Sequence, residues 1–437
     1  MSKNPEAQNA GKDMIALMEK LWPLNRSITG NGLRETLEIL KQIVPSLNIV
    51  EVKTGSKVLD WVVPQEWELI DAYLKDPDGN TIASLEENNL HIVGYSTAVN
   101  KELDLEELLP HLHSLPDQPE AIPYVTSYYK KNWGFCISEI EKQNLKKGKY
   151  KAYIDAKHFK GSLSYGELII PGKSEKEIFI STYCCHPSMA NNELSGPVVS
   201  LELAKWISSL ENLNYTYRFV FIPEMIGSAT YLEFNRKHLT KNVIAGFNLT
   251  CVGDDRAWSF LPSRSEKTYA DKVAEYALDR YVASYDKYEW KDRGSDESMY
   301  CAPGIDLPVV SVMRSKYGTY PEYHTSFDTI GRVVTEQGLQ KSFDLHKQMI
   351  TIIESDCFPL TQVLGEPQLG PRGLYPMLSK KGSTDIVKTR LDLISYADGN
   401  RSLLDISMKC QVSFEELLKE LKILVEHQIL KTKALWN

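Results

Sequence analysis

Four acidic or imidazole residues lie at the ends of apolar segments of the chain, or in the loops beside them. They are His186, Glu224, Asp254 and His324. Carboxylates and neutral imidazoles together make up the ligand set that zinc prefers in proteins. A zinc ion with one open coordination position can activate a water molecule. We therefore expect these residues to converge on one metal site with hydrolytic chemistry.

The segment around His186 indicates how such a site would be positioned. Residues 178–183 are a short apolar run typical of a buried strand, and His186 follows them after two cysteines. A polar loop then leads to Ser195, where the spacing of apolar residues over 198–207 predicts a helix. Open α/β sheets bind ligands outside the carboxyl ends of their strands, which is where this pattern puts His186. Taken alone, His186 is better explained as a structural histidine, but its partners along the chain favour a ligand.

Strands and helices alternate through the middle of the chain. Apolar runs predict strands over 217–222, 243–252 and 307–313, and helical spacing predicts helices over 227–234, 267–281 and 338–353. This order is typical of an α/β fold with a mostly parallel, doubly wound sheet. Glu224 and Asp254 follow two of these strands, so we expect them at the same edge of the sheet as His186.

The chain begins with two predicted helices, over residues 14–21 and 32–44, which a polar loop joins. Arg26 lies in this loop. Its charge is either solvated at the surface or an anchor for a substrate carboxylate, a role that suits the planar guanidinium. The residues leave both interpretations open.

The pattern changes to short strands and turns after the second helix. We interpret residues 60–118 as a small β-rich domain that is inserted into a core made of residues 1–59 and 119–358. A dense aromatic cluster follows at 124–137. Such a cluster predicts core or interface packing, or the wall of a pocket.

The C-terminal part is different in kind. Residues 359–382 are rich in Pro and Gly and predict a linker. Residues 383–437 contain three helical segments and a short strand-like run, which indicate a winged-helix domain. From Ser379 to Asn437, ten Lys and Arg face eight Asp and Glu, a net charge of +2. DNA-binding domains concentrate more positive charge, so nucleic acid is not an expected partner, and packing or dimerisation is favoured.

Length and composition agree with a soluble protein of two or three domains. The chain has 437 residues, 42% of them hydrophobic, and a net charge of −8. No apolar stretch is long enough to span a membrane, and the N-terminus lacks the apolar core of a signal peptide. The seven cysteines include no C-x-x-C pair, which favours reduced thiols. We expect a cytoplasmic protein without a membrane partner, and a homo-oligomer remains open.

Three motifs carry a resemblance to a known group of enzymes. His186 with residues 192–196 resembles the histidine and the D-N-x-S-G loop of the co-catalytic zinc aminopeptidases, the MH clan of metallopeptidases. Residues 294–305 resemble that clan's G-S-D-H…G-I-P segment, and residues 323–329 resemble its Y-H-T-x-x-D-T motif. The whole chain is similar to a bacterial family of aminopeptidase-like proteins with a C-terminal winged helix, often linked to polysaccharide biosynthesis.

The resemblance implies a three-layer α/β/α core like that of zinc exopeptidases, an insert like the protease-associated domain, and an appended winged helix. It implies one or two zinc ions per chain. His186 and Asp254 would hold one metal, Glu224 and His324 would hold the second, and Asn192 stands where the clan has a bridging carboxylate. A neutral amide cannot offset the charge of two close cations, so a single zinc is easier to support.

The same resemblance suggests catalytic roles and leaves some of them open. Glu224 is either a ligand or the general base, with Glu193 as a second candidate base, and Asp296 would orient the site. Asn248 or Thr250 could occupy the clan's aspartate position in place of Asp254. The residues expected to bind substrate, or to stabilise an oxyanion, are Tyr323 and Arg26.

These observations predict a zinc-dependent hydrolase, an aminopeptidase that cleaves N-terminal residues from peptides or related amides by metal-activated water. The first alternative is a degenerate metallopeptidase fold that acts as a binding or regulatory module, in agreement with Asn192 and with the single glutamate after Pro223. The second alternative is a transcriptional regulator acting through the winged helix.

Overall fold

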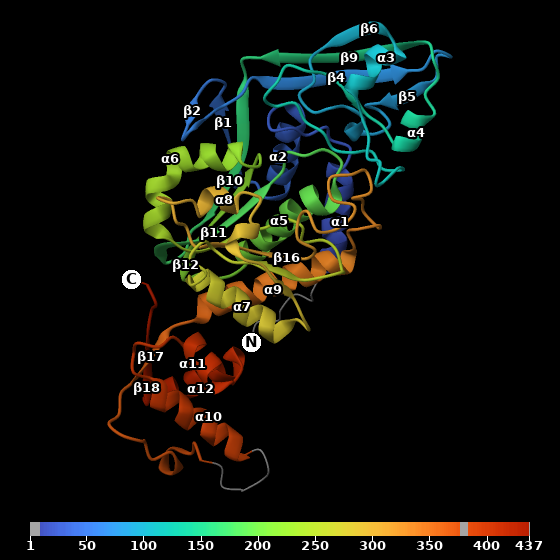
Figure 1. Ribbon diagram of the computed structural model, residues 1–437. Coiled ribbons are helices and arrows are strands. Elements are labelled where there is room, and N and C mark those ends of the chain that lie inside the picture. The colour runs from blue at the N-terminus through green and yellow to red at the C-terminus, as the bar shows by residue number, and fades with distance from the viewer. Residues whose placement is uncertain (1–8, 376–382, 437) are drawn as a thin grey trace. The chain divides into compact units, whose positions relative to one another are not determined.

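An eight-stranded sheet lies at the centre of the first of two units, the part of the chain up to His346 (Figure 1). The structure is a computed structural model that describes residues 9–375 and 383–436. In order across the sheet, the strands are β1 (Asn48–Lys53), β10 (Ser162–Ile170), β12 (Tyr215–Ile222), β11 (Ser174–Tyr183), β13 (Val243–Asn248), β16 (Val309–Met313), β14 (Ser259–Leu261) and β15 (Asp286–Lys287).

The centre of this sheet is parallel and its margins are mixed. Strands β12, β11, β13 and β16 are parallel neighbours, whereas β1 with β10, β10 with β12, and β14 with β16 are antiparallel pairs. The α/β class is confirmed, with a mixed sheet in place of the mostly parallel one. Residues 177–183 of β11 and 217–222 of β12 are all buried because helices cover both faces of a parallel sheet.

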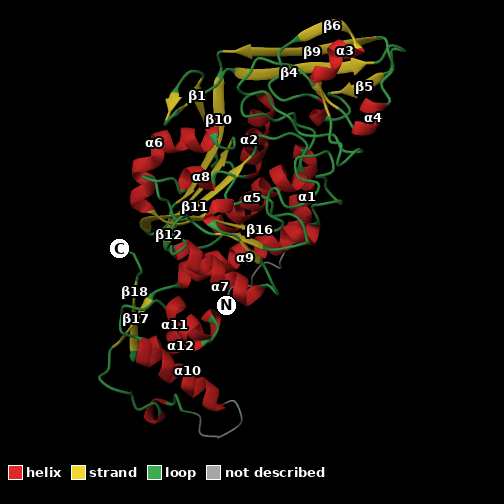
Figure 2. Cartoon of the chain, in the orientation of Figure 1, coloured by secondary structure: helices red, strands yellow, loops and turns green. Residues whose placement is uncertain are grey.

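Helices α5 (Ser195–Ser208) and α6 (Ile226–Asn242) lie on opposite faces of the sheet (Figures 1 and 2). Helix α5 connects β11 to β12, and α6 connects β12 to β13 on the other side of β11. Right-handed connections that run in opposite directions along a sheet place their helices on opposite faces. The remaining helices of this unit are α1 (Ala10–Leu21), α2 (Asn31–Ile43), α3 (Leu105–Leu108), α4 (Glu139–Gln143), α7 (Tyr269–Tyr281), α8 (Glu297–Tyr300) and α9 (Glu336–Ser355), which runs on into the second unit.

A second, four-stranded sheet forms the β-rich insert. Its order is β5 (Thr81–Ser84), β4 (Glu66–Lys75), β9 (Lys149–Phe159) and β6 (Val99–Asp104). Strand β9 lies beyond the predicted end of the insert at residue 118, and its residues 151–159 pair with β4. Two short pairs complete the unit, β2 (Lys57–Val58) with β3 (Trp61–Val62) and β7 (Leu112–His113) with β8 (Phe135–Cys136).

The second unit, from Lys347 onward, contains the expected winged-helix elements among its described residues. They are helices α10 (Ser383–Tyr396), α11 (Leu403–Cys410) and α12 (Phe414–Glu426), with strand β17 (Phe358–Thr361) paired to β18 (Leu430–Lys433). The Ser413 side chain caps α12 by accepting the N–H of Glu416. Strand β17 covers the start of the segment predicted as a linker. Its partner β18 is distant in the sequence, so the local pattern did not reveal this strand. Residues 376–382 of the predicted linker lie outside the described residues.

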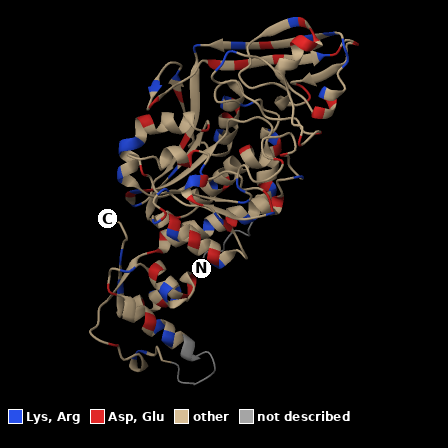
Figure 3. Cartoon of the chain, in the orientation of Figure 1, with Lys and Arg blue, Asp and Glu red and all other residues tan. Residues whose placement is uncertain are grey.

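The charges of both units are mixed in sign. Figure 3 shows Lys and Arg interspersed with Asp and Glu along the helices and strands. Within the described ranges, every helix is too short or too polar to cross a membrane.

Candidate metal centre and active site

His186 lies just after β11 and presents its two ring nitrogens to two different carboxylates. Its Nδ1 lies 2.6 Å from Oε2 of Glu193, a short hydrogen bond between two buried side chains. Its Nε2 lies 3.5 Å from Oε2 of Glu224, a wider separation than that of a hydrogen-bonded pair of this kind. A carboxylate on one imidazole nitrogen fixes the orientation of the ring and directs the other nitrogen to a metal.

Glu193 reaches His186 because the chain between them forms a π-helical turn, Ala190–Leu194, whose side chains are all buried. Turns of this kind insert an extra residue into a helix and are frequent at functional sites. Asp328 stabilises the turn by accepting the backbone N–H groups of Asn191 and Asn192 at 2.7 and 2.9 Å. Burial raises the pKa of Asp328 to about 6, although these hydrogen bonds oppose the shift.

Arg26 lies beside Glu193 in the interior of the protein, and its side chain does not line a surface open to substrate. Its side chain is fully buried and Nε lies 3.9 Å from Oε1 of Glu193. The guanidinium donates to the backbone oxygens of His186 and Leu21 at 2.9 and 2.5 Å. Burial lowers the pKa of Arg26, and Glu193 counteracts that shift. The structure therefore does not bring Arg26 to a position where a substrate carboxylate could reach it.

Glu224 follows β12 and is held at the carboxyl end of the sheet. The hydroxyl of Ser295 donates to its Oε1 at 2.7 Å, and Oε2 faces His186. Its side chain is 23% exposed, so one side of the carboxylate remains open to solvent. Removal from bulk water raises the pKa of Glu224, and the adjacent His186 partly offsets this effect.

Asp296 is a second buried carboxylate beside Glu224. Its Oδ1 accepts the N–H of Met225 at 2.8 Å and the hydroxyl of Ser228 at 2.7 Å. Its Oδ2 is buried and has no hydrogen-bond partner among the described residues. Burial and the charge of Glu224 raise the pKa of Asp296 well above its usual value. Its hydrogen bonds go to the residues that follow Glu224, and its role in orienting the site stays a prediction.

His324 approaches His186 from the loop after β16. Their ring centroids lie 5.8 Å apart, and the Tyr124 ring meets both imidazoles edge-on at 5.1 and 5.2 Å. Tyr323 stacks on His324 at 3.8 Å. Burial, and then the neighbouring His186, lower the pKa of His324 to about 3, so its ring is neutral and can bind a metal.

The backbone around these residues is strained. Ser188, Met225, Cys251 and His324 adopt positive φ angles of 44°, 61°, 52° and 57°. Such conformations are costly for residues other than glycine and cluster where function requires them. The loop of His324 is held by the N–H of Tyr124, which donates to the His324 carbonyl at 2.9 Å.

His186 and Glu224 are spaced as two ligands of one zinc ion would be, and the His324 ring lies beside them. Two ligand atoms on a tetrahedral zinc lie about 3.4 Å apart, close to the 3.5 Å between His186 Nε2 and Glu224 Oε2. The His324 ring centroid lies 5.8 Å from that of His186, wider than the spacing of about 5 Å for two imidazoles on one zinc, and the donor atoms of His186, Glu224 and His324 do not all lie within 4.8 Å of one another. Glu193 and Glu224 bring two carboxylates to His186, and within the described residues Arg26 is paired only with Glu193.

A different set of donors lies on the other side of the imidazole. Cys185 Sγ, His186 and Glu193 have potential ligand atoms within 4.8 Å of one another. However, the 2.6 Å between Nδ1 and the Glu193 oxygen is a hydrogen bond and is shorter than the spacing of two zinc ligands. Burial also raises the pKa of the Cys185 thiol well above its usual value, which disfavours the thiolate. The Nε2 side is the better metal site.

Asn192 lies at the edge of the site. Its Nδ2 donates to the Tyr183 hydroxyl at 2.7 Å, and Thr250 Oγ1 lies 2.5 Å from the same hydroxyl. The Asn192 Oδ1 is buried and has no hydrogen-bond partner among the described residues. The predicted bridging position therefore carries a neutral oxygen near the site, with nothing to balance a second cation.

Asp254 is not brought to the histidines. Both of its oxygens are used elsewhere, since the side chain of Asn191 and the N–H of Ser315 donate to Oδ2 at 3.0 and 2.8 Å. The Ser315 hydroxyl and the N–H of Arg256 donate to Oδ1, each at 2.9 Å. Asn248, the other candidate for this position, donates from Nδ2 to Glu297 at 3.0 Å.

Comparisons with known proteins establish the family of the chain. A family described as a domain of unknown function, DUF4910, matches residues 15–356. The chain belongs to the DUF4910 family. A winged helix-turn-helix family matches residues 357–432, which include β17.

A relative of this DUF4910 protein from Clostridium acetobutylicum is 40% identical over 434 residues and covers 97% of both chains. Its name describes a polysaccharide biosynthesis protein with an aminopeptidase-like domain. A crystal structure from the same organism, described as that of a peptidase, has a TM-score of 0.91 at 38% identity and covers 97% of both chains.

More distant solved structures establish the fold of the DUF4910 protein. The zinc aminopeptidase BSAP of Bacillus subtilis has a TM-score of 0.57 at 14% identity and covers 80% of this chain and 95% of its own. An aminopeptidase of Aneurinibacillus has a TM-score of 0.51 at 14% identity, with 79% and 93% covered. The predicted zinc-exopeptidase-like fold is thereby confirmed.

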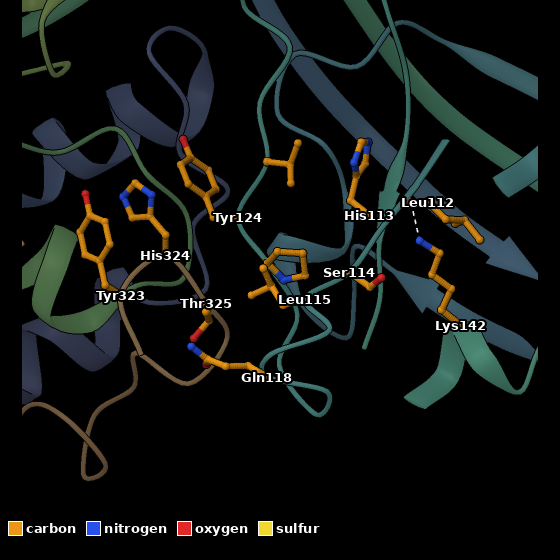
Figure 4. A pocket seen from close by; sticks show the side chains of 12 residues that line it. Leu112, His113, Ser114, Leu115, Gln118, Tyr124, Lys142, Tyr323, His324 and Thr325 are labelled. Carbon is orange, nitrogen blue, oxygen red and sulfur yellow. Dashed lines mark hydrogen bonds between the residues drawn. The ribbon is translucent and has the colours of Figure 1, made fainter. Parts of the chain in front are cut away.

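A cavity of about 500 Å³ adjoins His324 in the DUF4910 protein (Figure 4). Its walls are Tyr323–His324–Thr325, residues 123–125, residues 112–115 with Gln118 of the predicted insert, and Lys142 of α4. Figure 4 shows Tyr124, Tyr323 and His324 together at one end and His113 and Lys142 at the other. His186 and Glu224 do not line it, but Tyr124 and His324, which do, both contact His186, so the cavity adjoins the candidate metal centre.

Three residues of the site were not predicted in their observed roles. Glu193 was considered only as a base, and its contact with His186 depends on a π-helical turn that apolar spacing does not reveal. Asp328 belongs to a recognised motif, which could have indicated its role in stabilising the Asn191–Asn192 backbone. Tyr124 starts the aromatic cluster whose pocket interpretation agrees with the cavity.

Proposed function

We propose that this DUF4910 protein is a zinc-dependent hydrolase of peptide or related amide bonds, with one zinc held by His186, Glu224 and His324. The observation that carries the proposal is the 3.5 Å separation of His186 Nε2 and Glu224 Oε2, with the His324 ring beside them. Two histidines and one glutamate form the ligand set of several catalytic zinc sites, which keep a fourth position open.

When bound, zinc polarises a substrate carbonyl and lowers the pKa of water. The residues of the chain would hold and orient the groups that react. Glu193 fixes the His186 ring through Nδ1, and Ser295 fixes the Glu224 carboxylate through Oε1. Asp296 holds the backbone beside Glu224 in place, because its Oδ1 accepts the N–H of Met225 and the Ser228 hydroxyl.

Tyr323 is the candidate donor to the substrate oxygen. Its ring is fixed by stacking on His324, and it lines the cavity. Burial raises its pKa, so the phenol keeps its proton and can donate a hydrogen bond to developing negative charge. Tyr124 contributes a second buried phenol, whose hydroxyl lies 3.1 Å from that of Tyr128.

The test is to purify the full chain without added zinc, measure bound zinc, and assay aminoacyl 4-nitroanilides with and without chelator. We expect one zinc per chain and turnover that the chelator abolishes. H186Q and H324Q should each lose the metal. Failure of the wild-type chain to bind zinc at micromolar concentration would contradict the proposal.

A binding module is the second candidate, because a neutral Asn192 and the distant Asp254 resemble a degenerate two-metal site. Stoichiometric zinc without turnover of peptides, amides or acylated sugars would support it. Acylated sugars are included because the Clostridium relative is named for polysaccharide biosynthesis.

A further inference from the structure

The cavity beside His324 has an unusual set of charges for an enzyme that would bind a free amino terminus. Twelve residues line it, and none is Asp or Glu. Recognition of an ammonium group usually requires a carboxylate. The walls of this cavity offer none.

Lys142 of α4 supplies the cation of the cavity. Its Nζ donates to the backbone oxygen of Leu112 at 3.3 Å, which uses one of three ammonium hydrogens (Figure 4). Glu139, one turn earlier on α4, is the acidic group beside Lys142. Its two oxygens accept hydrogen bonds from Ser114 at 2.6 Å and from Gln143 at 3.0 Å, and it is not part of the lining. The ammonium therefore keeps donors available to a ligand.

His113 lies on the same wall as Lys142. Burial, followed by the positive charge of Lys142, lowers the pKa of His113, so the imidazole is neutral and Lys142 is the single formal charge of this wall. His113 and Gln118 are neutral groups that can accompany it as hydrogen-bonding partners. One ammonium with neutral donors matches a single carboxylate, whereas phosphate groups are usually held by several cations or by arginine forks.

The size and position of the cavity suit a substrate side group. About 500 Å³ falls in the range of small-molecule pockets. Tyr124 and His324 line one end of the cavity and also contact His186, so a group bound at this end lies beside the candidate metal centre.

We propose that this cavity binds a carboxylate-bearing group of the substrate, with Lys142 as its specificity-determining residue. The inference rests on the proposed function for the position of the scissile amide, but the carboxylate preference itself depends on residues outside the metal centre. The substrate class is therefore an acidic amide or peptide, with its carboxylate on the side of the scissile bond that faces the insert.

The test uses two neutral-ended probes that differ only in charge, N-acetyl-glutamate α-amide and N-acetyl-glutamine amide, titrated calorimetrically into the full chain with and without zinc. The aspartate and asparagine analogues extend the test to a shorter side chain. We expect the acidic member of at least one pair to bind at least tenfold more tightly. K142M should abolish the preference, and K142R should retain it.

Lys146 offers a matched control, because its side chain is 71% exposed and pairs with Asp78 on the surface. K146M should leave the preference unchanged. Equal binding of both members of each pair by the wild-type chain, or a preference that survives in K142M, overturns the inference. Loss of zinc binding with the preference intact would contradict the proposed function and not this inference, since Lys142 is outside the proposed ligand set.

Discussion

Nδ1 of His186 and Oε2 of Glu193 lie 2.6 Å apart, and both side chains are buried. This contact decides which nitrogen of the imidazole is left for a ligand. It also joins a residue at the end of β11 to a turn seven residues later, with the buried Arg26 behind it. The His186 ring is therefore oriented by the buried Arg26–Glu193 pair, which substrate does not reach.

Replacement of Glu193 by glutamine should weaken zinc binding about 10- to 100-fold, which is the usual cost of removing a carboxylate that orients a histidine ligand. The amide can still hydrogen-bond to Nδ1, but it cannot raise the basicity of the ring. Competition with a chromophoric chelator measures the change. E202Q, a surface substitution on α5 at a residue paired with Lys205, is the control. Unchanged affinity in E193Q would show that the contact does not orient a ligand.

Arg26 and Glu193 should be coupled in stability. R26M leaves Glu193 as a buried carboxylate without its cation, and such a change typically costs about 3 to 5 kcal/mol. E193M likewise leaves the Arg26 guanidinium buried among backbone oxygens. The double variant R26M/E193M removes both charges, so we expect it to lose less free energy of unfolding than the sum of the single variants. Urea denaturation of the four proteins measures the coupling, and additive losses would contradict it.

The sequence predicts the ends of the central strands well and the turns after them poorly. His186 and Glu224 lie at one edge because long apolar runs define β11 and β12, and parallel strands end at the same edge. Asp254 was expected with them, but β13 ends at Asn248 and the backbone reverses near Cys251, where φ is 52°. Its carboxylate is then used by Ser315.

The roles of Tyr124 and Glu193 depend on features that a single sequence does not encode locally. Tyr124 reaches the site because its N–H pairs with the His324 carbonyl, 200 residues away in the chain. Glu193 depends on the π-helical turn. Both are consequences of tertiary packing, which periodicity does not report.

The substitution Asn192→Asp should raise zinc affinity at least tenfold. Asn192 bonds to Tyr183, whose ring lies 5.4 Å from that of His186, so a charge at this position lies close to the proposed metal. A carboxylate there would add favourable Coulomb energy in a poorly solvated environment. Competition titration measures the change, with N144D on the exposed end of α4 as control. Equal affinity in N192D and wild type would mean that Asn192 does not face the metal.

His346 should make the first unit sensitive to acid. It is buried on α9, its Nδ1 lies 2.8 Å from the Ser342 carbonyl oxygen, and its Nε2 has no hydrogen-bond partner within the described part of the chain. Burial lowers the pKa of His346 to about 4, below the value near 6.5 of an unfolded chain. The unfolded state thus binds the proton more readily, and stability present above pH 6.5 is lost as the pH falls toward 4.

At pH 5 this loss amounts to about 2 kcal/mol from His346 alone. H346L removes the titrating group and keeps an apolar helix face, so its stability should change less between pH 7 and pH 5 than that of the wild type. Urea denaturation of metal-free protein at the two pH values tests this. An identical pH dependence in both proteins would exclude His346 as the cause.

Tyr323 should affect turnover and not metal content. The phenol lines the cavity beside His324, and its raised pKa keeps the proton on the oxygen. If it donates to the carbonyl oxygen as negative charge develops, Y323F should lower kcat about 10²- to 10³-fold, with little change in KM, because the interaction strengthens only in the transition state. Phenylalanine preserves the stacking on His324, so zinc content should remain that of the wild type.

Y129F, at a side chain that is 86% exposed, is the control. A rise in KM with kcat unchanged would assign Tyr323 to ground-state binding, and a loss of zinc would assign it to the support of His324.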